Sequence, residues 1–546
     1  MRLATALLTL VYASVLAAIG FAFFLSGLNP MGASLSLLIG VLAGGLAWWR
    51  TESWPSPPIR LWDGLMLGAF ALASLRAFLW LIYTRGDAVC VLSPNNLGDM
   101  SLHLNFIRYF ASGVPFWPES PMLTGVPLAY PVGADLFNSL FESFGFDTYR
   151  TLIWTGLGGA ALTGFLLWRW GGNFGLAALL FNGGLAGFVF LRTLKLDDYQ
   201  TELIWKNFFL SMFVTQRGLL VALPAGLLLL TVWRERYFRS GRRILPFPLE
   251  LLLYVGIPLF NFHTFLFLSL TLFAIFLARP AARKELLIFV GTALIPGTLC
   301  VLLITACLLV SHIPDPWHGI MEGKAFVDWV TDFGLTLPLA LAAGILLIRD
   351  RDTEARCFVW TAIVVFIICC VRKFAPWSWD NMKLVLWAWL ALAPYLWLKV
   401  IKPLHVSARV ALCLALFFSG FISLLGGLDG RHGYDIAHRS DLVRWQAALR
   451  SIPPTARFAT VSDFNNPIFL LGRKVVCDYT GHLWSHGLDY EDKFNRLQRV
   501  LNQEPGWEDE ALDLGADYVV FRKDSDWQKP PEIFDIRGSE SPPPKP

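Results

Sequence analysis

Two acid/base side chains open a polar segment in a chain that is otherwise strongly apolar. Asp99 and His103 are four residues apart in GDMSLHLNFIRYF, so a helix over this segment places both on one face near its start. A carboxylate beside an imidazole can accept a proton and pass it on. We therefore take Asp99 as the candidate base and His103 as its neighbour, although an aspartate that only caps the helix fits the same residues equally well.

Two further cations stand where apolar runs begin. Arg217 lies in TQRG at the mouth of one run, where a cation is costly unless it meets a phosphate or a carboxylate. We predict a phosphate contact there rather than a plain interfacial anchor. Asp380 and Lys383 in WSWDNMK are three residues apart, so they can simply pair with each other, and Lys383 is the better second phosphate contact.

The segment 97–135 is polar, aromatic and interrupted by prolines and glycines, which favours turns over long helices. Tyr130 adds an amphipathic side chain typical of a membrane interface, and Asp135 closes the segment at the start of a new helix. Both are candidate substrate contacts, together with His263 in NFHTF. For His263, an interfacial histidine whose hydrogen bonds lie within the protein is the commoner outcome.

The spacing of two histidines near the C-terminal end raises the question of a metal site. His482, His486 and Asp489 lie together in GHLWSHGLDY, but the segment lacks an H-E-x-x-H pattern and its glycines argue against a continuous helix. The eight cysteines show no C-x-x-C or zinc spacing. We assign no metal ligands and no certain cofactor, and keep a divalent metal as an open alternative.

Composition determines the solvent around these residues. The 546 residues are 55% hydrophobic and 16% charged, with 23 tryptophans and a mean hydropathy of +0.53, which is typical of a polytopic membrane protein. A formal net charge of +4 is too small for this length to indicate a nucleic-acid partner.

Apolar runs predict about thirteen transmembrane helices, counting the run 246–277 as two that fold back near His263 because it is too long for one span. RERYFRSGRR at 234–243 is a basic cluster typical of the cytoplasmic side. A cytoplasmic N-terminus then places every basic loop inside, and the loop 85–150 and everything after about residue 427 outside. We therefore expect a multi-pass protein of the cytoplasmic (inner) membrane whose C-terminal part is external, or periplasmic.

Composition also divides the chain into three parts. Residues 1–428 form the predicted all-α membrane domain, with its external loop at 85–150. Residues 429–535 alternate helix-like and strand-like pieces, such as DLVRWQAALRSI and RFATV, which predicts a small external α/β domain. The end, 536–546, contains GSESPPPKP and is predicted to be disordered.

Several of these segments resemble the GT-C superfamily of integral-membrane glycosyltransferases. GDMSLHLNFIRYFASGVPF, LAYPVGADL, TQRG, NFHTF, WSWDNMK and SDFNNPIFLLGRKV are similar to segments of uncharacterised bacterial and archaeal members. The resemblance implies a GT-C-like domain that takes a sugar from a polyprenyl-phosphate carrier at the external face, without a nucleotide sugar. The implied partners are a polyprenyl-phosphate-sugar lipid, a glycan, lipid or protein acceptor, and the membrane. The first loop lacks the paired acids D-D, D-E or D-x-D of better-known branches.

We therefore expect a membrane glycosyltransferase that moves a hexosyl or pentosyl group from a lipid-linked donor to an acceptor. Such a transfer needs a carboxylate to take the acceptor proton and cations to hold the departing phosphate. The alternative is a non-catalytic transporter or assembly factor for lipid-linked glycans, which also keeps charged residues near its pathway. The clustering of polar residues at one face favours the enzyme, because alternating access needs a site near the middle of the membrane.

Overall fold

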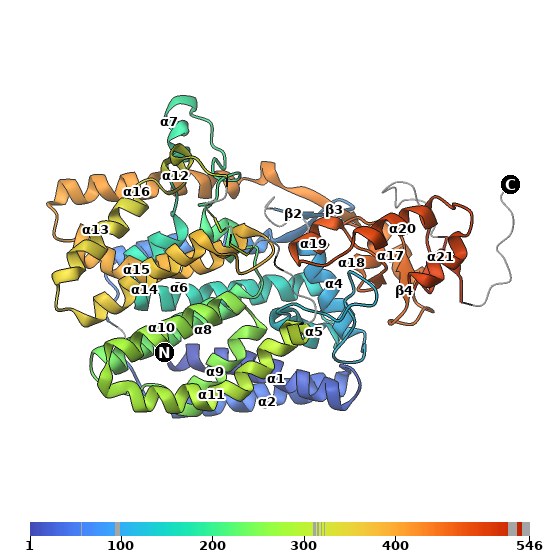
Figure 1. The fold of residues 1–546 in the computed structure, drawn as a ribbon, viewed down its shortest axis with the longest axis horizontal. Coiled ribbons are helices and arrows are strands. Elements are labelled where there is room, and N and C mark those ends of the chain that lie inside the picture. The colour runs from blue at the N-terminus through green and yellow to red at the C-terminus, as the bar shows by residue number, and fades with distance from the viewer. Residues whose placement is uncertain are drawn as a thin grey trace.

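A computed structural model describes residues 1–55, 57–92, 99–308, 313, 316–317, 319–320, 323–521 and 532–537. Most of the predicted disordered end, 538–546, lies outside the described residues. Long helices form a bundle, and a smaller α/β part stands at one end of it (Figure 1). The predicted fold class, a polytopic all-α membrane domain followed by a small α/β unit, is confirmed.

The bundle is built from twelve of the described helices. They are α1 (Arg2–Phe24), α2 (Pro30–Arg50), α3 (Leu61–Leu79), α6 (Thr148–Leu180), α8 (Leu219–Phe238), α9 (Phe247–Gly256), α10 (Phe262–Ala278), α11 (Arg283–Ile304), α13 (Thr336–Arg349), α14 (Thr353–Val371), α15 (Met382–Tyr395) and α16 (Val406–Gly427). Four further helices lie in the connections: α4 (Asp99–Ala111), α5 (Gly133–Glu142), α7 (Phe190–Thr193) and α12 (Phe326–Phe333). Thirteen of the fourteen residues of α15 are buried, all except Lys383, so this helix runs through the centre of the bundle.

Eight of the described helices are long and apolar enough to cross a membrane, or nine if the bent pair α12 and α13 is one span. This number is lower than the predicted number of about thirteen. The difference has three physical causes. The bent helix α6 is counted once, the helices α9 and α10 are short, and α8 ends in the charged residues Arg234, Glu235 and Arg236.

The chain reverses direction at two places within the bundle. Within α6, Gly172 adopts a φ of +60°, and a Cβ added to Gly175 would lie 3.1 Å from the carbonyl oxygen of Leu167, so the chain bends back on itself there. Between α9 and α10, the Tyr254 hydroxyl lies 2.8 Å from the Ser269 hydroxyl, across the break that precedes His263. The predicted fold-back of the run 246–277 is therefore confirmed.

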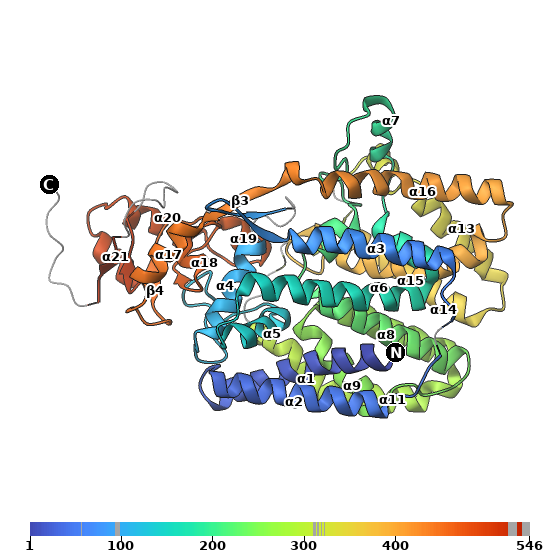
Figure 2. The ribbon, with the colours of Figure 1, turned by 180° about the vertical axis from the view of Figure 1, so that it is seen from behind.

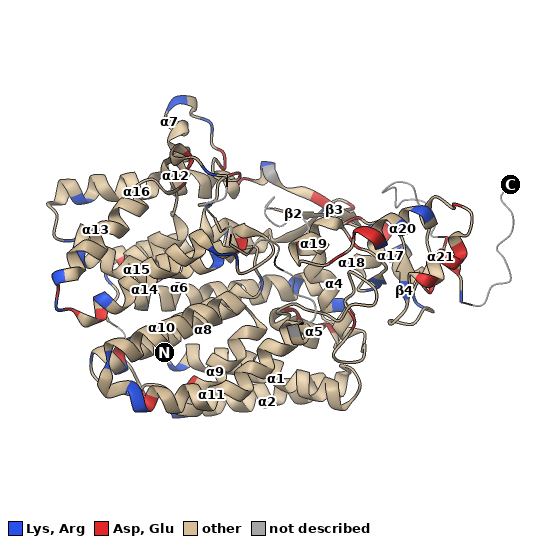
Figure 3. Cartoon of the chain, viewed as in Figure 1, with Lys and Arg blue, Asp and Glu red and all other residues tan. Residues whose placement is uncertain are grey.

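The starts and ends of several helices gather at the end of the bundle opposite the α/β part. Arginines that follow or end α8 form ion pairs with Glu250 in α9, Glu285 in α11 and Glu354 in α14, and with Glu52 after α2. Figure 3 shows that charged residues are sparse along the bundle helices and frequent at their ends and on the α/β part. This grouping matches the set of loops that the charge pattern predicts on one side of the membrane.

A three-stranded sheet ties the first loop to the C-terminal part. Strands β1 (Ile82–Arg85) and β2 (Ala88–Val91) form an antiparallel hairpin, and β3 (Tyr434–His438) pairs with β2 in an antiparallel register that places Ala88 opposite His438. The Asp87 carboxylate accepts hydrogen bonds from the Ser440 hydroxyl at 2.6 Å and from its backbone N–H at 3.0 Å. The loop and the C-terminal part are thus joined through main-chain hydrogen bonds.

The α/β part has a four-stranded sheet of order β5-β4-β6-β7. Its strands are β4 (Arg457–Ala459), β5 (Lys474–Val475), β6 (Tyr518–Val519) and β7 (Phe534–Asp535), of which β4 runs parallel to β5 and β6. Its helices are α17 (Arg439–Ala448), α18 (Pro467–Leu470), α19 (Thr480–Ser485), α20 (Glu491–Leu501) and α21 (Trp507–Asp513). Seen from behind, in Figure 2, α17 and α18 lie between this sheet and α4 of the first loop.

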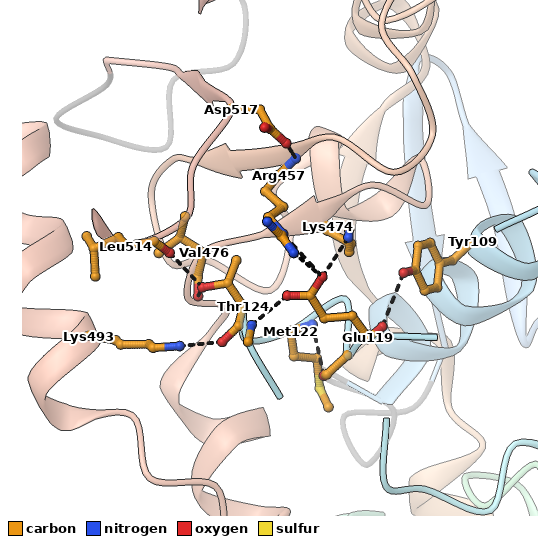
Figure 4. A network of polar contacts seen from close by, with 12 residues as sticks. Tyr109, Glu119, Met122, Thr124, Arg457, Lys474, Val476, Lys493, Leu514 and Asp517 are labelled. Carbon is orange, nitrogen blue, oxygen red and sulfur yellow. Dashed lines mark hydrogen bonds and ion pairs between the residues drawn. The ribbon is translucent and has the colours of Figure 1, made fainter. Parts of the chain in front are cut away.

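A polar network fastens the α/β part to the first loop (Figure 4). The Glu119 carboxylate binds Lys474 at 2.8 Å and Arg457 at 3.0 Å, and it accepts the Gly125 backbone N–H at 2.5 Å. The Thr124 hydroxyl donates to the Leu514 carbonyl at 3.0 Å. Burial alone would raise the pKa of Glu119, but the hydrogen bonds from Lys474 and Gly125 and the charge of Lys474 bring it below its ordinary value.

Candidate functional site

A cavity of about 440 Å³ lies where the first loop, the starts of several bundle helices and the α/β part meet. Six of the eight predicted site residues line it. They are Asp99, His103, Tyr130, His263, Asp380 and Lys383. Asp135 lies directly behind His103, and Arg217 follows the lining residue Gln216. Segments far apart in the sequence therefore bring the eight side chains together.

His103 and Asp135 form a buried pair between α4 and α5. Nδ1 of His103 lies 2.9 Å from Oδ1 of Asp135, and the two side chains are 5% and 1% exposed. A carboxylate at Nδ1 favours the tautomer that carries its proton there, as a hydrogen bond to one ring nitrogen does in general. Nε2 of His103 is then the nitrogen available to a ligand in the cavity.

Asp99 is the first residue of α4, and His103 follows it by one helical turn. Burial raises the pKa of Asp99, while the charges of His103, His482 and Lys383 oppose that rise. A carboxylate with a raised pKa holds a proton more firmly than an exposed aspartate does, so it is the stronger base once it is ionised. Asp99 therefore lines the cavity with a carboxyl group whose pKa is raised.

Arg217 lies in the turn that precedes α8, between two residues that line the cavity. The residue is 2% exposed, and its Nε donates to the Thr215 carbonyl at 3.2 Å. Its two terminal guanidinium nitrogens are buried and have no hydrogen-bond partner among the described residues. Asp99, Asp135 and Tyr130 are its closest electrostatic neighbours. Burying guanidinium nitrogens without hydrogen-bond partners costs free energy. An anionic ligand that binds the two terminal nitrogens would offset this cost.

Asp380 and Lys383 lie side by side on the opposite wall of the cavity. Their charged atoms are 3.0 Å apart, so the simple pairing that their spacing suggests is present. Lys206 lies nearby with its ammonium 5.2 Å from the centroid of the Trp379 ring. Two lysines, Lys206 and Lys383, therefore line the cavity, and Arg217 lies between its lining residues Gln216 and Gly218.

His486 is a cavity residue that we did not predict. Its Nδ1 lies 2.5 Å from the His482 carbonyl oxygen, its Nε2 is buried without a partner among the described residues, and its ring centroid is 5.0 Å from that of Tyr130. Burial lowers the pKa of His486 to about 4, so the ring is neutral at pH 7. The four-residue histidine spacing in GHLWSHGLDY could have indicated it, but we considered that spacing only as a metal pattern.

Lys206 is the second cavity residue that sequence reasoning missed, since no motif surrounds it in the segment 194–215. His482, by contrast, binds Asp478, with Nδ1 and Oδ2 2.7 Å apart. The described residues contain no group of three His, Cys, Asp or Glu side chains that could hold a metal ion. Asp135 behind the cavity is engaged by His103, and Asp380 in its lining is engaged by Lys383, which leaves only the carboxylate of Asp99, so these residues do not fit a divalent metal.

Two crystal structures of the Archaeoglobus fulgidus oligosaccharyltransferase are similar to this chain. One is the apo form, with 14% sequence identity and a TM-score of 0.48, and the other is tethered by a disulfide bond to an acceptor peptide containing the NVT sequon, with 12% identity and a TM-score of 0.47. Each match covers 84% of this chain and 69% of that one. The likeness is one of fold. The chain matches no protein-family model and no curated protein.

Proposed function

We propose that this protein is a membrane glycosyltransferase that moves a sugar from a polyprenyl-phosphate-linked donor to an acceptor at the external face of the cytoplasmic membrane. One observation carries the proposal. A carboxylate and a histidine of a His–Asp pair line one cavity of a multi-pass protein, and next to its lining lies a buried arginine whose terminal nitrogens have no hydrogen-bond partner among the described residues. This set supplies the proton acceptor and the phosphate contacts that the transfer requires.

The proposed reaction uses Asp99 as the base. The acceptor hydroxyl attacks the anomeric carbon, its proton passes to the Asp99 carboxylate, and the bond between the anomeric carbon and the phosphate oxygen breaks. Arg217 and Lys383 bind the phosphate as negative charge develops on its oxygen. The proton can then move from Asp99 to His103, which Asp135 orients, so that the two side chains share it.

A lipid-linked donor is supported by an apolar groove beside the cavity. The groove measures about 220 Å³, lies between α13, α14 and α15, and is lined almost entirely by apolar side chains. Trp205 and Val385 line the groove, and their close neighbours in the sequence, Lys206 and Lys383, line the cavity. We propose that the hydrocarbon chain of the donor occupies this groove while its phosphate lies at Lys206 and Lys383.

The test is sugar transfer by the full-length protein in nanodiscs. Polyprenyl-phosphate donors carrying different radiolabelled hexoses or pentoses are incubated with glycan, lipid and peptide acceptors. We expect at least one donor to lose its sugar to an acceptor, and the transfer to stop when Arg217 is replaced by alanine. Donor binding without any transfer or hydrolysis over the whole panel would instead support a transporter or assembly factor that uses the same cavity.

A further inference from the structure

A second large cavity lies apart from the reaction cavity. It measures about 690 Å³ and lies between α4, the end of α5 and α17. Arg108 of α4, Arg450 after α17 and Arg473 before β5 line it, against the single carboxylate of Glu142. Arg108 and Asp99 are nine residues apart on α4, which is about 14 Å along the helix axis. We call this cavity the basic cleft.

The positive charge of the basic cleft is not neutralised by the protein. Arg473 donates to three main-chain carbonyls at and after the end of α17, at 2.8 to 3.0 Å, and Arg108 donates to one carbonyl at the end of α18, at 2.7 Å. Arg450 is exposed, and Glu142 is engaged by the Thr148 hydroxyl. Within the described ranges, none of the three guanidinium groups forms an ion pair. The cleft therefore attracts an anion.

An apolar groove opens beside the basic cleft at the connection between α5 and α6. It measures about 400 Å³ and is lined by side chains of α1, α5, α6 and α8. Phe141 lines the groove, and its neighbour Glu142 lines the cleft. Phe146 and Trp154, which also line the groove, are 59% and 69% exposed, and α6 is a candidate membrane span. We therefore expect the groove to face the lipid chains and the basic cleft to face the membrane surface.

We propose that the basic cleft and this groove together hold one anionic phospholipid, with its phosphate against Arg108 and Arg450 and an acyl chain in the groove. A soluble phosphate or an acidic glycan would occupy the cleft but leave the groove empty. A phospholipid fills both, because it carries an anionic phosphate and hydrocarbon chains in one molecule. The bound lipid connects α17 of the α/β part to α4, α5 and α6 of the first loop and bundle, so anionic lipid strengthens their docking.

The headgroup is tested by native mass spectrometry of the full-length protein released from detergent. Dioleoyl phosphatidylglycerol should bind with one molecule per protein and more tightly than dioleoyl phosphatidylcholine. Arg450→Gln, at an exposed residue without a partner to lose, should weaken phosphatidylglycerol binding roughly fivefold. Arg439→Gln is the matched control, because Arg439 is exposed at the start of α17, the helix that Arg450 follows, but does not line the cleft, and this variant should bind as the wild type does.

The acyl chain is tested by filling the groove. Gly158 lines the groove and has no atom within 4 Å of an added Cβ, so Gly158→Leu occupies the space without a clash and should abolish retention of the lipid. Gly45→Leu, at an equally open glycine of α2 outside the groove, should retain it. Equal affinity for the two lipids, complete displacement by inorganic phosphate, or full retention by Gly158→Leu would overturn the proposal. None of these measurements depends on sugar transfer, so a negative result would refute the lipid site without bearing on the proposed glycosyltransferase activity.

Discussion

Replacement of Asp99 by asparagine separates a chemical role of this residue from a structural one. Asparagine has nearly the same size and starts a helix about as well, but it cannot accept a proton. A general base contributes roughly 10²- to 10⁴-fold to a rate, or about 3 to 5 kcal/mol. His103 lies one turn away with Nε2 available and Asp135 behind it, so a second base remains and the loss should lie near the lower end of this range.

The structure also predicts how stability and pH dependence respond to Asp99→Asn. Burial raises the pKa of Asp99, so the ionised carboxylate is disfavoured in the folded protein and its replacement by a neutral amide should leave the thermal unfolding midpoint near that of the wild type. The wild-type rate should fall as the pH falls through the raised pKa, because the base becomes protonated, and this acid limb should disappear in the variant.

The assay measures initial rates of labelled-sugar transfer from pH 5 to 9, with circular dichroism as the measure of folding. Asp99→Glu is the matched control, because it keeps the carboxylate and should retain part of the activity. Wild-type rates from a folded Asp99→Asn protein would remove Asp99 from the mechanism. Attention would then move to the His103–Asp135 pair.

Four further expectations follow from the described contacts. Arg217→Ala should weaken donor binding roughly 10- to 100-fold, seen as a higher Kd in a direct donor-binding measurement, and Arg217→Lys should restore part of it. His486→Phe keeps the ring beside Tyr130 but removes Nε2, so it should raise KM for the donor more than it lowers kcat; an unchanged KM would exclude a substrate contact. Because its folded-state pKa is lowered, Glu119 stabilises the docked α/β part fully above about pH 4 and loses this effect as the pH falls further; Glu119→Gln should flatten this acid dependence in thermal unfolding measured from pH 3 to 6. A cysteine at position 241, between the arginines that follow α8, should resist an impermeant thiol reagent added to intact cells, in a background free of other accessible cysteines, and labelling from outside would reverse the proposed orientation.

Local spacing in the sequence carried much of the information on the fold and on the candidate site. The four-residue separation of Asp99 and His103 is enough to place them on one face of α4, and the length of the run 246–277 is enough to require its reversal before His263. These inferences depend only on helix geometry and on the thickness of a membrane.

Contacts between distant segments could not be obtained in this way. Nothing near β2 indicates that its partner is β3, because both strands are short and their pairing depends on how the whole bundle brings the two chain segments together. His486 reaches the cavity only because the α/β part docks on the first loop through Glu119 and Thr124. Fewer helices than predicted have the length of a membrane span. The apolar helices α9 and α10, for example, belong to the bundle but are shorter than such a span.

The pairing of β2 with β3 has a consequence for how the protein is made. Ala88 and His438 face each other across the sheet but are 350 residues apart. At a synthesis rate of about 5 to 20 residues per second, the hairpin of β1 and β2 waits roughly 20 to 70 s for its third strand to leave the ribosome. During this time the unpaired edge of β2 can form a sheet with another chain. Because both strands are short, such pairing is weak. A ribosome that stops early therefore leaves an inserted bundle with an unfinished cavity, so synthesis itself delays any sugar transfer until the last part of the chain has folded.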